Sequence, residues 1–187
     1  MRTLAAAVDA AIATVLAALA DGPIGVACSG GADSMALAAA ALAAAPGRIV
    51  VVTIDHQLRA ASAEVAAGVA AWARARGARA EVRTVAVEPR ASIEAAARAA
   101  RYAALDAAIA ERGLGAMLLG HTARDQAETV LLRLLRGTGP AGLAGIAARR
   151  GPYLRPLLEL PRAATEAYVA LHAVPVWPDP MNADVTL

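Results

Sequence analysis

Short apolar runs alternate with longer amphipathic stretches along this chain. The runs, which predict strands, occupy residues 24–27, 49–54, 80–87 and 116–120. The run 49–54 is nearly continuous in apolar, β-branched residues, which is typical of a strand buried on both faces of a parallel sheet. The stretches between them carry apolar residues at helical spacing and predict helices over about 4–20, 35–45, 62–76 and 92–112, with two more beginning near residues 122 and 161. The alternation predicts an α/β fold, a doubly wound, mostly parallel sheet with helices on both faces.

The turn between the first predicted strand and the next helix reads SGGADS, residues 29–34. Two adjacent glycines let the backbone bend sharply and approach a ligand closely. Free N–H groups and the positive end of the helix dipole meet at such a helix start, so the turn can bind a phosphate or pyrophosphate. An ordinary turn capped by Asp33 or Ser34 explains the same residues. A Walker A loop is excluded because it needs a lysine, and all 18 basic residues are arginines.

The second predicted strand ends in the sequence DHQLR, residues 55–59. In an open parallel sheet, ligands bind beyond the carboxyl ends of the strands. Asp55, His56 and Arg59 are therefore expected at the same edge as the phosphate-binding turn. A loop histidine without a role accounts equally well for His56. Ser62, which follows shortly after, is expected to cap the next helix.

The fourth predicted strand leads into a second polar stretch, HTARDQAET, residues 121–129. His121 falls at the end of the strand, and Asp125 and Glu128 share one face of the helix that follows. Thr122 and Asp125 also match a capping box, and Glu128 could pair with an arginine, so helix capping and an ion pair explain much of the pattern. Beside a phosphate-binding turn, however, the same groups could bind Mg²⁺ and take a proton from an attacking amine.

Two helices carry further residues of interest. Glu94, Arg98 and Arg101 lie at i, i+4 and i+7 on one helix face, where a solvated Glu–Arg pair worth only ~0.3–0.5 kcal/mol is the simpler explanation. Residues 131–135 are apolar and are expected mostly in the core. The glycine-rich stretch 137–145 that follows is typical of a flexible connection.

The composition limits the class of protein. A chain of 187 residues suits one domain, with a core expected over about 22–160, and a formal net charge of +2 is weak support for a nucleic-acid partner. The single cysteine excludes a disulfide framework and a four-cysteine metal site within one chain, and favours a reducing, cytoplasmic compartment. No run reaches the ~20 strongly apolar residues of a membrane span, and the N-terminal stretch does not look like a signal peptide.

The SGGADS turn resembles the pyrophosphate loop of N-type ATP pyrophosphatases, which cleave ATP between the α- and β-phosphates to adenylate a substrate. Four segments match in order and spacing, namely 29–34, 55–59, 94–102 and 121–145, with a weaker fifth over 155–182. Together they resemble the N-terminal domain of the bacterial tRNA(Ile)-lysidine synthetase family. The most specific part is LGHTARDQAETVLLRLLRGTGPAGLAGI, and the match covers about residues 25–184.

This resemblance implies a two-step reaction that uses ATP and Mg²⁺. ATP adenylates the C2 carbonyl oxygen of the wobble cytidine in tRNA(Ile) with a CAU anticodon, and pyrophosphate leaves. The ε-amine of free L-lysine then attacks C2 and AMP leaves. The implied phosphate-binding residues are Ser29, Gly30, Gly31, Asp33 and Ser34, with Asp33 also near Mg²⁺. His56 and Arg59 would lie near the nucleotide, and Arg101 would face the phosphates. The residues that would bind lysine and act in catalysis are His121, Asp125 and Glu128.

The resemblance also sets expectations about organisation and rivals. The chain is expected to be a single PP-loop domain over 1–187 that lacks the family's C-terminal tRNA-binding domains, as a fragment, a truncated product or a minimal form; a homodimer is compatible with it.

The nearest alternative is a tRNA 2-thiolation enzyme of the same superfamily, which generally needs paired cysteines, whereas Cys28 is alone. A glutamine-dependent synthetase would need a glutaminase domain for which the chain has no room. A nucleotide- or RNA-binding module without activity stays open, and would release no pyrophosphate.

Overall fold

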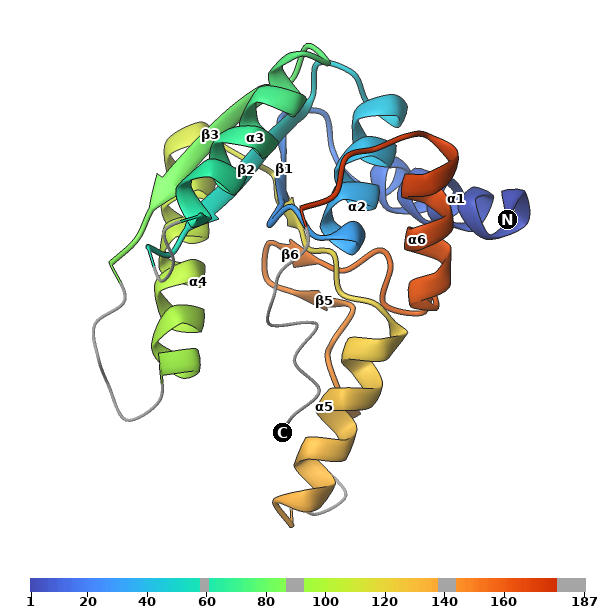
Figure 1. Ribbon diagram of the computed structural model, residues 1–187, viewed down its shortest axis with the longest axis vertical. Coiled ribbons are helices and arrows are strands. Elements are labelled where there is room, and N and C mark those ends of the chain that lie inside the picture. The colour runs from blue at the N-terminus through green and yellow to red at the C-terminus, as the bar shows by residue number, and fades with distance from the viewer. Residues whose placement is uncertain (58–60, 87–92, 138–143, 178–187) are drawn as a thin grey trace.

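A computed structural model describes residues 1–57, 61–86, 93–137 and 144–177, so Arg59 and residues 178–187 lie outside the described residues, as do the side chains of Ile93 and Glu94. Within this part (Figure 1), the helices are α1 (Arg2–Ala17), α2 (Ala32–Ala44), α3 (Ser62–Arg74), α4 (Ile93–Arg112), α5 (Ala123–Leu135) and α6 (Arg162–Leu171). The strands are β1 (Ile24–Ala27), β2 (Ile49–Asp55), β3 (Arg79–Thr84), β4 (Ala116–Leu118), β5 (Arg149–Arg150) and β6 (Tyr153–Leu154). Each predicted element is therefore present, with bounds shifted by a few residues.

The strands form one sheet in the order β3-β2-β1-β4-β6-β5. Every neighbouring pair is parallel except β5 and β6, which form a short antiparallel hairpin. The chain builds outward from β1 in one direction through β2 and β3, and then returns to place β4 on the other side of β1. This reversal is the switch point of a doubly wound fold, and the crevice above it is where such folds bind ligands.

Helices cover both faces of the sheet, as the sequence predicted. Successive side chains of a strand point to opposite faces, and β2 shows the consequence clearly. Val51 belongs to the apolar cluster that includes residues of α2 and α3, whereas Val50 and Val52 belong to the cluster that includes Leu105 of α4. Because both faces are covered, β2 is buried almost throughout, which explains its unbroken apolar sequence.

Two local expectations differ from the structure. Ser62 does not cap α3: Ala61 occupies the cap position without a side-chain hydrogen bond, and the Ser62 hydroxyl instead donates to Asp55 Oδ1 at 2.5 Å. The β5–β6 hairpin was not predicted at all. Its strands are two residues each, too short to show the alternation that reveals a strand.

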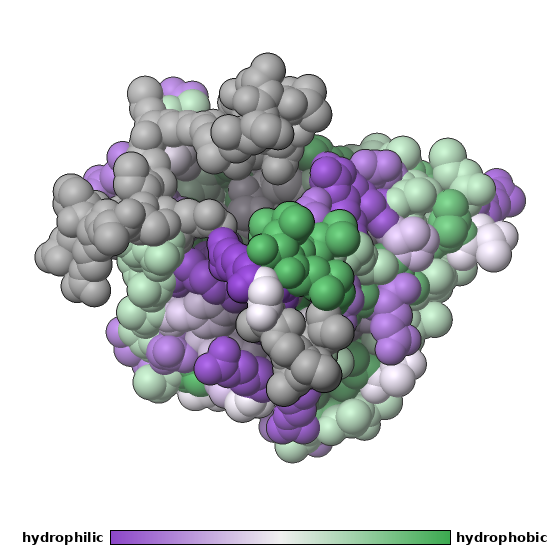
Figure 2. Space-filling view, turned by 90° about the horizontal axis from the view of Figure 1, so that it is seen from below, coloured by the Kyte–Doolittle hydropathy of each residue, from purple (hydrophilic) through white to green (hydrophobic). Residues whose placement is uncertain are grey.

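The expectation that residues 131–135 belong to the core is wrong. Four leucines there are more than half exposed, Leu131, Leu132, Leu134 and Leu135, the last at 84%. The reason is the direction of α5, which projects away from the sheet and lies on neither face (Figure 1). Viewed from the end to which α5 points, the surface carries an apolar patch (Figure 2). Apolar content cannot distinguish a core helix from one whose apolar side is left open.

Gly120, just after β4, lies against the start of α2. A Cβ at this position would be 3.0 Å from Ser34 Cα and 3.1 Å from Ser34 N, and backbone atoms cannot yield easily. We expect Gly120→Ala to lower the free energy of unfolding by about 1–3 kcal/mol in denaturant titration. Gly115→Ala is the matched control, because the nearest atom to its Cβ would be 4.0 Å away. Equal losses in the two variants would contradict the assigned contact.

Candidate active site

A cavity of about 500 Å³ opens at the carboxyl ends of β1, β2 and β4, above the switch point of the sheet. The structure brings most of the predicted site residues to its wall: Ser29, Gly31, Asp33, Ser34, His56, Arg101, His121 and Asp125. These residues come from segments that are far apart in the chain. The parallel sheet unites them because its strands all end at the same edge.

Three predicted residues are not placed at the cavity wall. Gly30 is part of the loop, but it packs against α3: its φ is +90°, and a Cβ there would be 2.9 Å from Val65 Cγ1. Glu128 is more than half exposed and accepts a hydrogen bond from Arg124 Nε at 2.8 Å, one helical turn away. Its catalytic role therefore stays a prediction carried by the resemblance alone. Arg59 lies outside the described residues.

The phosphate loop is held together by the Ser34 hydroxyl. Ser29 N donates to Ser34 Oγ at 3.1 Å, and Ser34 Oγ donates to the carbonyl oxygen of Gly31 at 3.0 Å. Gly31 is the N-cap of α2, and no side chain caps this helix start. The N–H groups of the first turn are therefore available to an anion, and the helix dipole favours one there.

Asp33 occupies the first turn of α2 and faces the cavity. Burial raises the pKa of its carboxyl group above the usual value, while a hydrogen bond from Thr165 and the charge of Arg162 oppose that shift. The nearby carboxylate of Asp125 raises the Asp33 pKa further. A half-buried carboxylate with a second carboxylate nearby is costly to keep ionised, so the arrangement favours a positively charged ligand between them.

Arg101 supplies positive charge on the α4 side of the cavity. Burial is the main cause that lowers its pKa, and the neighbouring Arg98 lowers it further. Arg101 forms no ion pair with a carboxylate in the described part of the chain. Arg155, from the segment after β6, is only 6% exposed, and its guanidinium donates to Ala147 O at 2.8 Å and to the Tyr102 hydroxyl at 3.4 Å. A half-buried arginine at the cavity wall, without a carboxylate partner among the described residues, favours an anion such as a triphosphate beside it.

Both histidines at the cavity are held in the neutral form. Burial lowers the pKa of His121 to about 4, with Arg155 and Arg101 adding to the effect against the opposing charge of Asp125. Burial and Arg101 also lower the pKa of His56. The Nδ1 atoms of both rings are buried and have no hydrogen-bond partner among the described residues. A neutral imidazole keeps a lone pair for a hydrogen bond from a bound substrate, but a pKa of about 4 makes His121 a weak base in the empty cavity.

The depressed pKa of His121 predicts a pH effect on stability. Because the unfolded state has a pKa near 6.5, stability present above that pH is lost as the pH falls toward 4. Between pH 7 and pH 5 the expected loss from this group is about 1–2 kcal/mol. Denaturant titrations at the two pH values should show a smaller loss for His121→Asn than for the unaltered chain. Parallel losses would contradict a neutral, desolvated imidazole.

Asp125 combines helix capping with a place at the cavity. Its Oδ2 accepts hydrogen bonds from Thr122 N at 2.7 Å and Thr122 Oγ1 at 2.9 Å, which confirms the predicted capping box. Its Oδ1 accepts no hydrogen bond from the described residues. The capping explanation and a ligand-binding role are therefore compatible, because each uses a different oxygen.

Two residues that support the loop were not predicted from the sequence. Trp177 N donates to Gly30 O at 2.9 Å, and its ring fits against Gly68, where a Cβ would approach it to 2.8 Å. Thr165 of α6 donates a hydrogen bond to Asp33 Oδ1. Both contacts join parts of the chain far apart in sequence, and no local pattern marks them.

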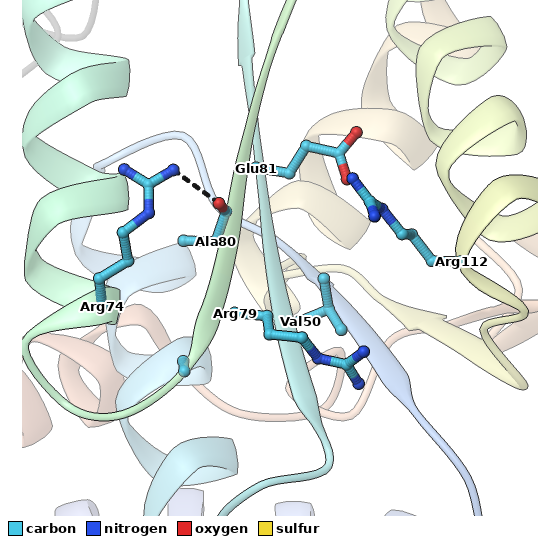
Figure 3. Close-up of a pocket in the computed structure, with 7 residues that line it drawn as sticks. Val50, Arg74, Arg79, Ala80, Glu81 and Arg112 are labelled. Carbon is cyan, nitrogen blue, oxygen red and sulfur yellow. Dashed lines mark hydrogen bonds and ion pairs between the residues drawn. The ribbon is translucent and has the colours of Figure 1, made fainter.

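A second cavity, of about 380 Å³, lies at the opposite ends of β2 and β3 (Figure 3). Arginines surround it, but Arg74 Nη2 donates to Ala80 O at 2.8 Å and Arg112 Nε pairs with Glu81 Oε2 at 2.9 Å. None of the predicted site residues lines this cavity. It lies at the amino ends of the strands, where doubly wound folds do not bind their ligands.

Comparisons with known proteins agree with this geometry. The family model described as "PP-loop domain" matches residues 4–187. A tRNA(Ile)-lysidine synthase of Salinispora tropica is 53% identical over 189 residues, which cover 96% of this chain and 57% of that protein. The enzyme of the same name from Streptomyces coelicolor is 49% identical, over 85% of this chain and 47% of that protein. The chain thus spans about half the length of the curated relatives it matches.

Solved structures share the fold at low sequence identity. A U34-tRNA thiolase from Methanococcus maripaludis with its [4Fe-4S] cluster has a TM-score of 0.76 at 15% identity, over 96% of this chain and 68% of that one. An NH3-dependent NAD synthetase from Campylobacter jejuni has a TM-score of 0.60 at 14% identity, over 92% of this chain and 73% of that one. No described helix of this chain is long and apolar enough to cross a membrane. Because the family model covers nearly the whole chain, this protein belongs to the PP-loop domain family.

Proposed function

We propose that this chain is the ATP-using catalytic domain of a tRNA(Ile)-lysidine synthase. The observation that carries the proposal is the single cavity that joins the phosphate loop to His121 and Asp125. One half of it suits a triphosphate, and the other offers a proton acceptor and a carboxylate for an amine. The names of the relatives add the substrate, a tRNA(Ile), and free L-lysine is the proposed amine.

Adenylation begins with ATP on the phosphate loop. The N–H groups at the start of α2 and the guanidinium of Arg101 hold the phosphates, and both stabilise the negative charge that grows on pyrophosphate as it leaves. The C2 carbonyl oxygen of the wobble cytidine attacks the α-phosphorus, and the bond between the α-phosphorus and the bridging oxygen breaks. Positioning these two substrates in one cavity supplies much of the rate enhancement.

Mg²⁺ fits this site as a cation shared with ATP. The described residues contain no cluster of three or more metal-binding side chains. Mg²⁺ commonly takes one or two carboxylates together with substrate phosphates and waters, and Asp33, with Asp125 nearby, meets that need. When bound, the ion would neutralise charge on the phosphates.

Lysine attack completes the reaction. The ε-ammonium group must lose a proton before it can act as a nucleophile, and the free oxygen of Asp125, or His121, would accept it. His121 becomes a stronger base when the negative charge of bound ATP offsets the arginines that lower its pKa. The new bond joins the lysine nitrogen to C2, while the bond between C2 and the adenylated oxygen breaks and AMP leaves. The carboxylate of Asp125 also attracts the ammonium form of lysine before the proton is lost.

Sulfur transfer to tRNA is a weaker candidate. The solved thiolase carries an iron–sulfur cluster, whereas this chain has one cysteine. Cys28 is buried, and burial raises the pKa of its thiol, which makes it a poor nucleophile. Cys28 is among the residues that line the cavity, but a single thiol provides no second cysteine for sulfur transfer.

The test is a reaction of the chain with ATP, Mg²⁺, labelled lysine and tRNA(Ile) bearing a CAU anticodon. Lysine-dependent AMP release with label entering the tRNA is the expected result. A tRNA with a different wobble base is the matched control. ATP binding without pyrophosphate release would identify a binding module, and absence of ATP binding would overturn the proposal. Light scattering on the same sample would detect the homodimer that the resemblance allows.

A further inference from the structure

Thr165 of α6 holds one oxygen of the Asp33 carboxylate. Its side chain is fully buried, and its hydroxyl donates a hydrogen bond to Asp33 Oδ1. The two residues are 132 positions apart, and they meet because α6 packs beside α2 (Figure 1). Arg162, in the first turn of α6, adds a positive charge that acts on the same carboxylate. Helix α6 therefore contributes to the site although none of its residues lines the cavity.

The second oxygen of Asp33 is left for a ligand. Asp33 lines the cavity, and its Oδ2 accepts no hydrogen bond from any residue that the structure describes. Asp125 has a similar environment. Thr122, which is 1% exposed, donates hydrogen bonds to Asp125 Oδ2, and Oδ1 accepts none from the described residues. Two buried threonines thus each fix one oxygen of a carboxylate and leave the other oxygen available at the same cavity.

This arrangement has a chemical consequence for a divalent cation. A carboxylate with one oxygen already engaged can give only its other oxygen to a metal, and Mg²⁺ with its strict octahedral geometry suits such one-oxygen ligation. Residues that orient a metal-binding carboxylate change metal affinity 10- to 100-fold when removed. The hydroxyl of Thr165 has a second acceptor within reach, the carbonyl oxygen of Arg162 at 2.8 Å. If Thr165 served only to stabilise the start of α6, the hydrogen bond to this carbonyl would be sufficient.

We propose that Thr165 is a positioning residue that makes Asp33 a one-oxygen ligand and thereby raises the affinity of the ATP-loaded site for a divalent cation. The inference rests on the proposed function, because it requires ATP in the cavity. It goes beyond that function by assigning a role in metal binding to α6, a helix outside the cavity wall.

The experiment compares Thr165→Ser with Thr165→Ala in the full 187-residue chain. Both substitutions remove the methyl group, and only serine keeps the hydroxyl, so the pair isolates the hydrogen bond. Calorimetric titration with ATP is run once with Mg²⁺ and once with EDTA. We expect Thr165→Ala to weaken binding of ATP with Mg²⁺ about tenfold or more, to leave metal-free binding unchanged, and Thr165→Ser to stay near the unaltered chain.

A second variant and a second readout guard against trivial failure. Thr165→Val keeps the shape of the side chain but lacks the hydroxyl. If Thr165→Ala destabilises the fold, the valine variant should still show the weakened binding of ATP with Mg²⁺. Electron paramagnetic resonance with Mn²⁺ measures free cation directly and should show more free Mn²⁺ for the alanine and valine variants at equal ATP.

Three results would overturn the inference. Equal affinities of the serine and alanine variants for ATP with Mg²⁺ would remove the role of the hydroxyl. Equal weakening with Mg²⁺ and with EDTA would show a general loss of the loop and no effect on the cation. Failure of the unaltered chain to bind ATP would overturn the proposed function together with the inference, and so differs from the first two outcomes.

Discussion

Asp33→Ala is expected to abolish pyrophosphate release while the chain stays folded. Asp33 is the carboxylate in the first turn of α2, and the proposed cation would bridge it to the phosphates. Its loss should reduce the rate of adenylation by at least ~10²–10³-fold, the range seen when one group that stabilises transition-state charge is removed. The measurement is pyrophosphate release with ATP and tRNA.

The fold should survive this substitution because the ionised carboxylate of Asp33 lowers the free energy of unfolding. Burial raises its pKa, so keeping the carboxylate ionised at neutral pH opposes folding. The thermal midpoint of Asp33→Ala should therefore equal or exceed that of the unaltered chain, and its circular dichroism should be unchanged. Asp21→Ala, at a fully exposed aspartate far from the cavity, is the matched control. A loss of the folded signal for Asp33→Ala would contradict this account.

Arg101→Ala is expected to weaken ATP binding by roughly 10- to 100-fold. The half-buried guanidinium has no carboxylate partner among the described residues, so the triphosphate would be its first counter-ion. Hydrogen bonds to charged groups contribute about 1.5–3 kcal/mol, which corresponds to this range. Arg101→Lys should recover part of the affinity only, because an ammonium group cannot bind two phosphate oxygens as the planar guanidinium does.

Arg98→Ala is the matched control for Arg101. Arg98 lies nearly one turn earlier on α4, stacks over the Tyr102 ring at 5.2 Å and does not line the cavity. Its removal should change ATP affinity little, and the difference between the two variants should shrink as salt concentration rises. Equal losses of affinity would show that α4 acts by general positive charge, without a specific contact from Arg101.

The site could be predicted from the sequence only as far as strand ends could be located. His56 and His121 follow apolar runs, and SGGADS follows a third, so sheet topology alone brings them to one edge. The inward position of Arg101 could not be derived from its spacing, which fits a solvated face equally well. The resemblance supplied that residue, and the structure then placed it at the cavity wall. For Glu128 the structure offers an exposed ion pair instead.

Local pattern was sufficient for the order of helices and strands, for the phosphate loop and for the capping box, because each depends on residues within a turn or two of one another. Periodicity and turn chemistry are properties of such short stretches. The exposure of Leu131–Leu135, the burial of Arg155 and the contact between Thr165 and Asp33 depend on the direction each element takes after it forms. Those directions follow from packing between distant segments, which leaves no periodic trace in the sequence, and so they were visible only in the assembled fold.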